Sequence, residues 1–147
     1  MTMSELNPDA LAHQVGVSMF AADTATRDTM GMELLFCKPG HASLRMTVTD
    51  KHLNGHQMCH GGFIFTLADS TFAFACNSHN KATVASAASI EFLKPAHAGD
   101  VLTCVGEEQV MSGRHGVYDM TVRNQHEQVI ALFRGKSAQI QGQVVPT

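Results

Sequence analysis

Residues 63–76 read FIFTLADSTFAFAC, a stretch that is apolar on almost every side and carries one acid, Asp69, near its middle. A segment that is apolar around its whole circumference is typical of a helix buried in a protein core or in a membrane. Asp69, Ser70 and Thr71 interrupt this one, and a membrane span needs about 20 mostly apolar residues. We therefore predict a long helix buried in the core of a globular protein.

The segments on both sides of this helix have the alternating pattern of half-buried strands. Leu44, Met46 and Val48 alternate with polar residues, and the pattern recurs around Tyr118. Two extended runs precede the helix, and four β-like runs follow it, at about 82–93, 101–111, 116–123 and 128–140. Short turns join these runs, which predicts an antiparallel meander. The expected class is α+β, with a six-stranded antiparallel sheet wrapped around one long buried helix.

The length and composition predict one globular domain over residues 1–147. The 147 residues match the common size of a domain, and a composition of 44% hydrophobic and 16% charged residues excludes a disordered chain. Pro8 and the helical spacing after it predict a helix over residues 8–20. Asp23 or Thr24 would cap a short turn that stops near Gly31. We expect residues 1–30 to form an N-terminal helical extension.

Charge and cysteine content indicate which classes of partner and which cellular compartment to expect. The net charge is −3 and the basic residues are scattered, which excludes a nucleic-acid surface. The first nine residues carry acids where a secretory signal would carry a basic patch, so we expect a cytoplasmic protein that binds no membrane. The four cysteines form no Cys-x-x-Cys pair and are expected to be reduced thiols, mostly in the core.

Gly61-Gly62 begins the predicted buried helix. The first N–H groups of a helix have no internal partner, and the helix dipole adds positive potential there. Glycine also lets a substrate carbonyl approach the backbone closely, so this turn could stabilise an oxygen that gains negative charge. The alternative is that the pair only permits a tight turn.

Asp69 is the candidate base or nucleophile. A carboxylate in the middle of an apolar helix is costly unless it is paired, hydrogen-bonded or next to a cavity, and desolvation should raise its proton affinity. The structural alternative is a carboxylate bonded to Thr66, Ser70 or Thr71. Eight residues separate Gly61 from Asp69, about 12 Å along a helix. Two antiparallel helices across a two-fold axis would bring Gly61 of one subunit to Asp69 of the other, so the chemistry predicts a dimer.

The loop before the helix is rich in histidines. His52, His56 and His60 are spaced four apart, as zinc ligands on a helix can be. Asn54 and Gly55 would break such a helix, and no His-Glu-x-x-His motif is present, so we predict no metal site. We interpret His52 and His56 as turn residues.

The sequence resembles the hotdog-fold acyl-CoA thioesterases, and within them the phenylacetate-degradation (PaaI) subfamily. The resemblance is carried by HLNGHQMCHGG (52–62), LAD (67–69), SIEFLKP (89–95), AGD (98–100), GVYD (116–119) and ALFRGKS (131–137). It spans residues 30 to 140. It implies a hotdog fold and a homotetramer of two dimers that hydrolyses aryl- or hydroxyphenylacetyl-CoA, with no cofactor besides the CoA of the substrate.

The resemblance also implies roles for particular residues. Asp69 would be the nucleophile or general base, and the Gly61 N–H would polarise the thioester carbonyl, with Gly62 also touching the substrate. Asn54 and His60 occupy positions of orienting or water-binding groups. The further substrate-binding candidates are Ser86 and Ser89 on the partner side of the pocket and Lys94, Arg134 and Lys136 for the CoA phosphates.

Two other functions remain possible from the sequence. A hotdog enoyl-CoA hydratase would hold its Asp and His close together in one loop–helix segment, whereas Asp69 lies nine residues beyond His60. An acyl-CoA sensor would gain little from a desolvated carboxylate facing a neutral thioester. The acyl preference depends on pocket shape and rests on the resemblance.

Overall fold

The computed structural model describes residues 5–147. The elements in chain order are α1 (Pro8–Ala22), the π-helical turn η2 (Ala25–Thr29), β1 (Glu33–Lys38), β2 (His41–Thr47), the 3-10 turn η3 (Asp50–His52), α2 (Gly61–Asn77), β3 (Thr83–Phe92), β4 (Val101–Ser112), β5 (His115–Arg123) and β6 (Val129–Gln139). The predicted order of short helices, two strands, one long helix and four strands is confirmed. None of the helices in residues 5–147 is long and apolar enough to cross a membrane.

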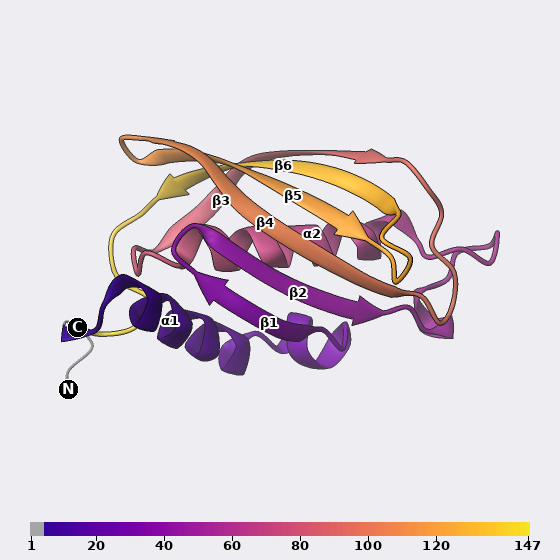
Figure 1. The fold of residues 1–147 in the computed structure, drawn as a ribbon, viewed down its shortest axis with the longest axis horizontal. Coiled ribbons are helices and arrows are strands. Elements are labelled where there is room, and N and C mark those ends of the chain that lie inside the picture. The colour runs from indigo at the N-terminus through magenta and orange to yellow at the C-terminus, as the bar shows by residue number, and fades with distance from the viewer. Residues whose placement is uncertain (1–4) are drawn as a thin grey trace.

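Six strands within residues 5–147 form one antiparallel sheet in the order β1-β2-β4-β5-β6-β3, and the sheet curls around α2 (Figure 1). The predicted meander is right for β4, β5 and β6. It is wrong for β3, which pairs with β6 and not with β4. The chain leaves the sheet after β2, passes along α2, and re-enters at the opposite edge, so β4 fills the place beside β2.

Helix α2 is covered by the sheet on most of its surface. Its buried residues include Leu67, Phe72 and Phe74, and the Phe72 ring lies so close to Gly135 that a Cβ there would be 2.6 Å from it. The helix is not buried all round, however. Gly62 is exposed, and Thr66, Asp69 and Ala73 are half-buried. These four residues, spaced four, three and four apart, define the open stripe of α2.

Strand β3 is the least covered element of the sheet. It lies at an edge, and residues 84–89 are exposed on both faces. An edge strand presents unpaired N–H and C=O groups that favour pairing with another strand. Within residues 5–147, the open stripe of α2 and the bare edge of β3 are therefore left uncovered.

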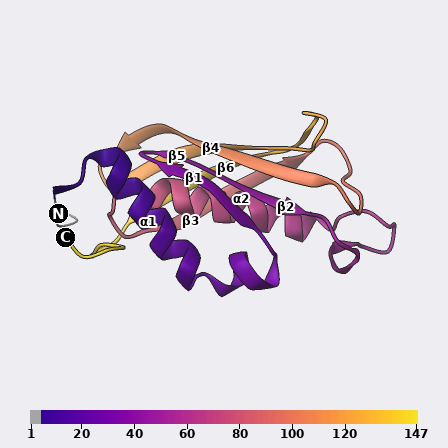
Figure 2. The same ribbon diagram turned by 60° about the horizontal axis from the view of Figure 1, so that its bottom comes forward.

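The N-terminal helix α1 packs against β1, as the view in Figure 2 shows. Gly16 allows this close approach, because a Cβ there would lie 2.6 Å from Cys37 Cβ. Asn7 caps α1 through a bond from Ala10 N–H (2.8 Å). The predicted helix and the turn near Asp23 are present, while residues 1–4 of the expected extension lie outside the described residues.

Candidate active site

The loop before α2 is a short hairpin. His60 N–H donates to the His52 carbonyl (2.8 Å), and Asn54 N–H donates to the Met58 carbonyl (2.8 Å). Asn54 Oδ1 also accepts the N–H groups of His56 (2.8 Å) and Met58 (3.2 Å). The Asn54 side chain therefore shapes the turn, while its Nδ2 donates to no group among the described residues.

His60 caps α2 and leaves one amide open. Its Nδ1 accepts the Gly62 N–H at 2.9 Å, so Nδ1 carries no proton and the neutral ring is protonated at Nε2. The Gly61 N–H has no hydrogen-bond partner in residues 5–147. Of the two predicted glycines, Gly61 is thus the open donor at the positive end of the helix, and the Gly62 amide is already used.

Gly61 borders a cavity of about 330 Å³ that also holds Asn54 and Lys94, two other residues predicted for the site. Six further residues line this cavity: Met58, Cys59, Ile64, Phe92, Leu93 and Pro95. Met58, like Phe63 and Phe72, is predicted to influence the pocket shape, and no role was predicted for the other five. Five of the six are apolar. Five of the six lie in the segments that carry the family resemblance, residues 52–62 and 89–95. Nothing in the sequence places them around one cavity, because only the folding of the hairpin onto the segment after β3 brings them together. The Cys59 N–H bond to the Ala96 carbonyl (2.7 Å) is part of that contact.

Cys59 is a potential nucleophile in this cavity by residue type. It is buried, and burial raises the pKa of its thiol to about 11. The thiolate is the nucleophilic form, and at neutral pH almost none of this thiol is ionised. The four cysteines are all free and buried, as predicted.

Asp69 lies on the open stripe of α2, and burial raises the pKa of its carboxyl group above the ordinary 3.8. No group in residues 5–147 donates a hydrogen bond to this carboxylate. The neighbouring hydroxyls have other partners: Thr66 donates to the Gly62 carbonyl, Thr71 to the Leu67 carbonyl, and Ser70 bonds Thr26. The structural alternative, a carboxylate satisfied by these hydroxyls, is therefore not what the chain forms.

A single chain does not bring Asp69 and Gly61 together. Asp69 is absent from the lining of the Gly61 cavity. Their offset of eight residues places Gly61 and Asp69 about 12 Å apart along α2. Helix α2 runs without a break from Gly61 to Asn77, so the predicted distance between Gly61 and Asp69 along the helix applies to the observed structure.

The remaining substrate-binding candidates lie on the strands β3 and β6. Ser89 and Arg134 line a cavity of about 350 Å³ on the sheet and also border, with Lys136, one of about 210 Å³. Arg134 makes two hydrogen bonds to Asp119 (2.6 and 2.8 Å), which engage its guanidinium. Ser86 Oγ donates to the Lys136 carbonyl at 3.1 Å. Lys94 is the predicted cation that shares a cavity with Gly61.

Of the two loop histidines interpreted as turn residues, His52 bonds the backbone with its ring, and no such bond is present for His56 among the described residues. His52 is buried, its Nδ1 accepts the Thr49 N–H (3.0 Å), and its ring packs against Phe63 at 5.0 Å. Burial lowers the pKa of His52, which favours the neutral ring. His56 is exposed at the hairpin tip. Within residues 5–147 no three His, Cys, Asp or Glu side chains gather into a possible metal site.

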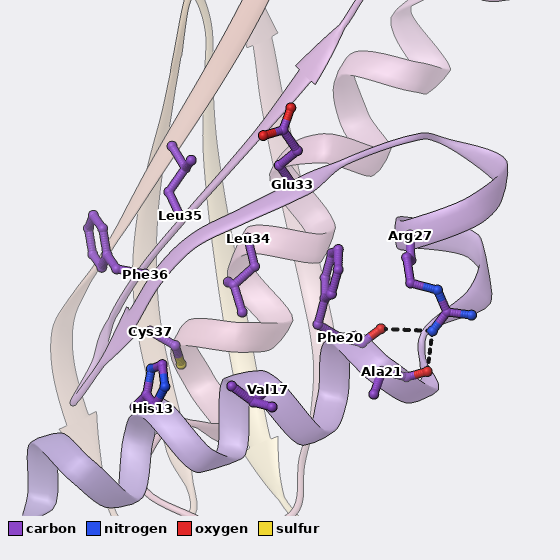
Figure 3. A pocket seen from close by; sticks show the side chains of 10 residues that line it. All are labelled: His13, Val17, Phe20, Ala21, Arg27, Glu33, Leu34, Leu35, Phe36 and Cys37. Carbon is purple, nitrogen blue, oxygen red and sulfur yellow. Dashed lines mark hydrogen bonds between the residues drawn. The ribbon is translucent and has the colours of Figure 1, made fainter.

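A larger cavity, about 680 Å³, lies between α1 and β1 (Figure 3). Its wall is mainly apolar, from residues such as Val17, Phe20 and Leu34. Arg27 at its end is engaged, because it donates to the carbonyls of Phe20 and Ala21 and to Asp28. This cavity contains none of the predicted site residues.

Known proteins resemble this chain in sequence and in fold. A family model described as the thioesterase superfamily matches residues 56–131. The chain is 44% identical over 133 residues to acyl-coenzyme A thioesterase PaaI of Escherichia coli K12, covering 90% of this chain and 94% of that protein. The solved E. coli PaaI structure superposes with a TM-score of 0.90 at 44% identity, over 93% of this chain and 99% of that one. A Streptococcus mutans protein, solved with bound acetyl-CoA, has a TM-score of 0.74 at 29% identity, over 76% of this chain and 90% of that one.

Proposed function

The chain belongs to the thioesterase superfamily and is an acyl-CoA thioesterase of the PaaI subfamily with the hotdog fold, and from this premise we propose that it hydrolyses aryl- or hydroxyphenylacetyl-CoA to the free acid and CoA. The observation that carries the proposal is the Asp69 carboxylate, half-buried on the open stripe of α2 and without a hydrogen-bond donor among the described residues. A half-buried carboxylate without a hydrogen-bond donor lowers the stability of the fold, and its raised pKa suits a base or nucleophile.

The reaction is proposed to use one group from each subunit. The thioester carbonyl accepts a hydrogen bond from the Gly61 N–H of one protomer, and the helix dipole stabilises the oxyanion that forms. Asp69 of the facing protomer then acts in one of two ways. It attacks the carbonyl carbon and forms a mixed anhydride that water hydrolyses, or it removes a proton from a water that attacks instead. In both routes the C–S bond breaks and CoA leaves as the thiolate, which takes a proton from water in the anhydride route and from the protonated Asp69 in the general-base route.

The two uncovered surfaces of the chain support the dimer. Pairing two β3 edges would satisfy their free N–H and C=O groups. Antiparallel helices with facing open stripes would place the first turn of one helix, which begins at Gly61, beside Asp69 of the other. Two such sites result from the two-fold symmetry. We further propose that two dimers form a homotetramer.

The other predicted residues have supporting roles in this proposal. His60 holds the first turn of α2 so that only the Gly61 amide faces the substrate, and Asn54 Nδ2 orients the substrate or a water in the same cavity. Lys94 is the first choice for the anionic CoA, with Lys136 next. Arg134 would have to share its guanidinium with Asp119.

The proposed function is tested with a panel of acyl-CoAs and a thiol reagent. Release of CoA thiol indicates hydrolysis; hydration of an enoyl-CoA without thiol release indicates a hydratase, and binding without reaction indicates a sensor. We expect hydrolysis that favours aryl-acetyl thioesters and persists after chelator treatment. Asp69→Asn should lose most turnover while Asp9→Asn, an exposed acid in α1, keeps it.

The two routes differ in where water oxygen goes. In a single turnover in labelled water, label enters the Asp69 carboxylate only if a covalent anhydride has formed. Label in Asp69 therefore identifies the anhydride route, whereas water that attacks the substrate carbonyl, in the anhydride or in the thioester itself, puts its label into the product acid.

A further inference from the structure

Phe92 is an exposed aromatic side chain at the end of β3. It pairs with Ala131 across the sheet, two residues on from the pairing of Ile90 with Phe133. Because side chains alternate along a strand, Phe92 is on the same face as Ile90, the face that covers α2. Its relative exposure is nevertheless 53%.

The ring is exposed because it faces the glycine start of α2. If Gly61 had a Cβ, that atom would lie 3.1 Å from Phe92 Cζ and 3.3 Å from Cε1. The ring therefore lies over the first turn of the helix, beside the open Gly61 N–H, and no side chain at position 61 covers it. Gly61 accordingly serves two purposes: it offers its amide and it leaves room for the ring.

The charges around this cavity indicate which part of a substrate meets the ring. Lys94 is the one charged residue in the described lining, and it lies just beyond the end of β3, two residues after Phe92. The CoA end of a thioester carries the phosphates, so it is expected to leave the Gly61 amide on the Lys94 side. The uncharged acyl group is then left on the side of the Phe92 ring.

We propose that Phe92 selects aromatic acyl groups by packing its ring against the aryl ring of a thioester whose carbonyl is bound at the Gly61 amide. The inference rests on the proposed thioesterase function and adds the residue that sets its acyl preference. Aromatic pairs in edge-to-face or offset geometry gain more than their buried area alone provides. That gain corresponds to a preference of about 2-fold to 13-fold for an aromatic ring over a saturated ring of the same size.

The test compares kcat/KM for phenylacetyl-CoA and cyclohexylacetyl-CoA, two substrates that differ in the aromaticity of one ring. The wild-type protein should prefer the phenyl substrate by the stated factor. Phe92→Leu should reduce the ratio to about one, since leucine keeps apolar contact without a ring. Phe92→Tyr should keep the preference. Ile140→Ala removes an equally exposed apolar side chain outside this cavity and should leave the ratio unchanged.

The outcomes separate this inference from the proposed function. If the wild-type protein hydrolyses neither substrate nor any other acyl-CoA, the proposed function fails. If it hydrolyses both with equal kcat/KM, the selectivity inference alone is wrong, and this result needs no variant to fold. A Phe92→Leu protein that loses activity equally on both substrates also overturns it, because the ring would then contact the CoA arm that both share.

Discussion

Mixing two inactive variants would test whether each active site is shared between subunits. Gly61→Pro removes the proposed carbonyl donor. Gly61 is the first residue of α2, where proline is well tolerated, and His60 already has the extended conformation that a following proline requires (φ −60°, ψ 134°). No helix hydrogen bond is lost, because the Gly61 N–H has none among the described residues. Gly61→Ala is the matched control, since it adds a Cβ toward Phe92 but keeps the N–H.

The expected magnitudes make the experiment decisive. Loss of one oxyanion donor costs about 10²-fold to 10³-fold in kcat, so Gly61→Pro should be nearly inactive. Loss of the general base in Asp69→Asn should cost about 10²-fold to 10⁴-fold. A dimer with one chain of each kind holds one site with both defects and one with neither. Random pairing makes about half of the dimers mixed, so about a quarter of all sites become intact.

The assay is CoA thiol release from the two variants refolded together at equal concentration. We expect about a quarter of wild-type kcat, far above either variant alone. Refolding each variant separately and mixing the products without exchange is the control, and it should show no recovery. If the co-refolded sample, shown to contain mixed dimers, stays at the level of the single variants, Gly61 and Asp69 do not act across an interface. Equal loss in Gly61→Ala and Gly61→Pro would instead mean that the added Cβ, and not the lost N–H, is responsible.

Single-residue changes test the site and the core. Because burial raises the pKa of Asp69 and the base must be ionised, kcat/KM should fall as pH drops through an apparent pKa above 3.8, and a flat profile down to 3.8 contradicts this role. Because the pKa is raised in the folded state, the stability that the protonated Asp69 contributes is lost as the pH rises through the folded-state pKa. Above that pKa, the melting temperature of Asp69→Asn should therefore rise relative to that of the wild-type protein. His60→Ala should lose about 1 kcal/mol of unfolding free energy in urea titration and His60→Ser should recover it, because serine can cap the helix; equal values refute the capping role. Gly135→Ala should lower the free energy of unfolding by about 1–3 kcal/mol in urea titration, since its Cβ would meet the Phe72 ring at 2.6 Å. Gly55→Ala is the control, because a Cβ there would have no neighbour within 4 Å and should lower the free energy of unfolding by less. Equal losses in the two variants contradict the packing argument.

Several features of the site are local and could be predicted. The start of α2 is determined by His60 and the two glycines, and an orphan N–H at the first helical residue follows from helix geometry alone. Asp69 was identifiable because a carboxylate in an apolar helix is costly wherever that helix lies. The separation of Gly61 and Asp69 needed only the rise per residue of a helix.

Other features depend on which strands pair. The β-like run of residues 82–93 identified a strand but not its neighbour, and a meander placed it beside β4. The pairing with β6 sets Arg134 opposite Ser89 and leaves the guanidinium on Asp119, away from Gly61. It also carries Phe92 over the first turn of α2, a contact with no signature in the sequence.

The sequence by itself determined the elements, the ends of the buried helix and the acid within it, because periodicity, capping and desolvation act over a few residues. The tertiary structure decided which side of that helix stays open and which aromatic ring lies beside its first amide. These depend on pairing between segments that are far apart in the chain, where many arrangements satisfy the same local pattern and only the packing of the whole core selects one.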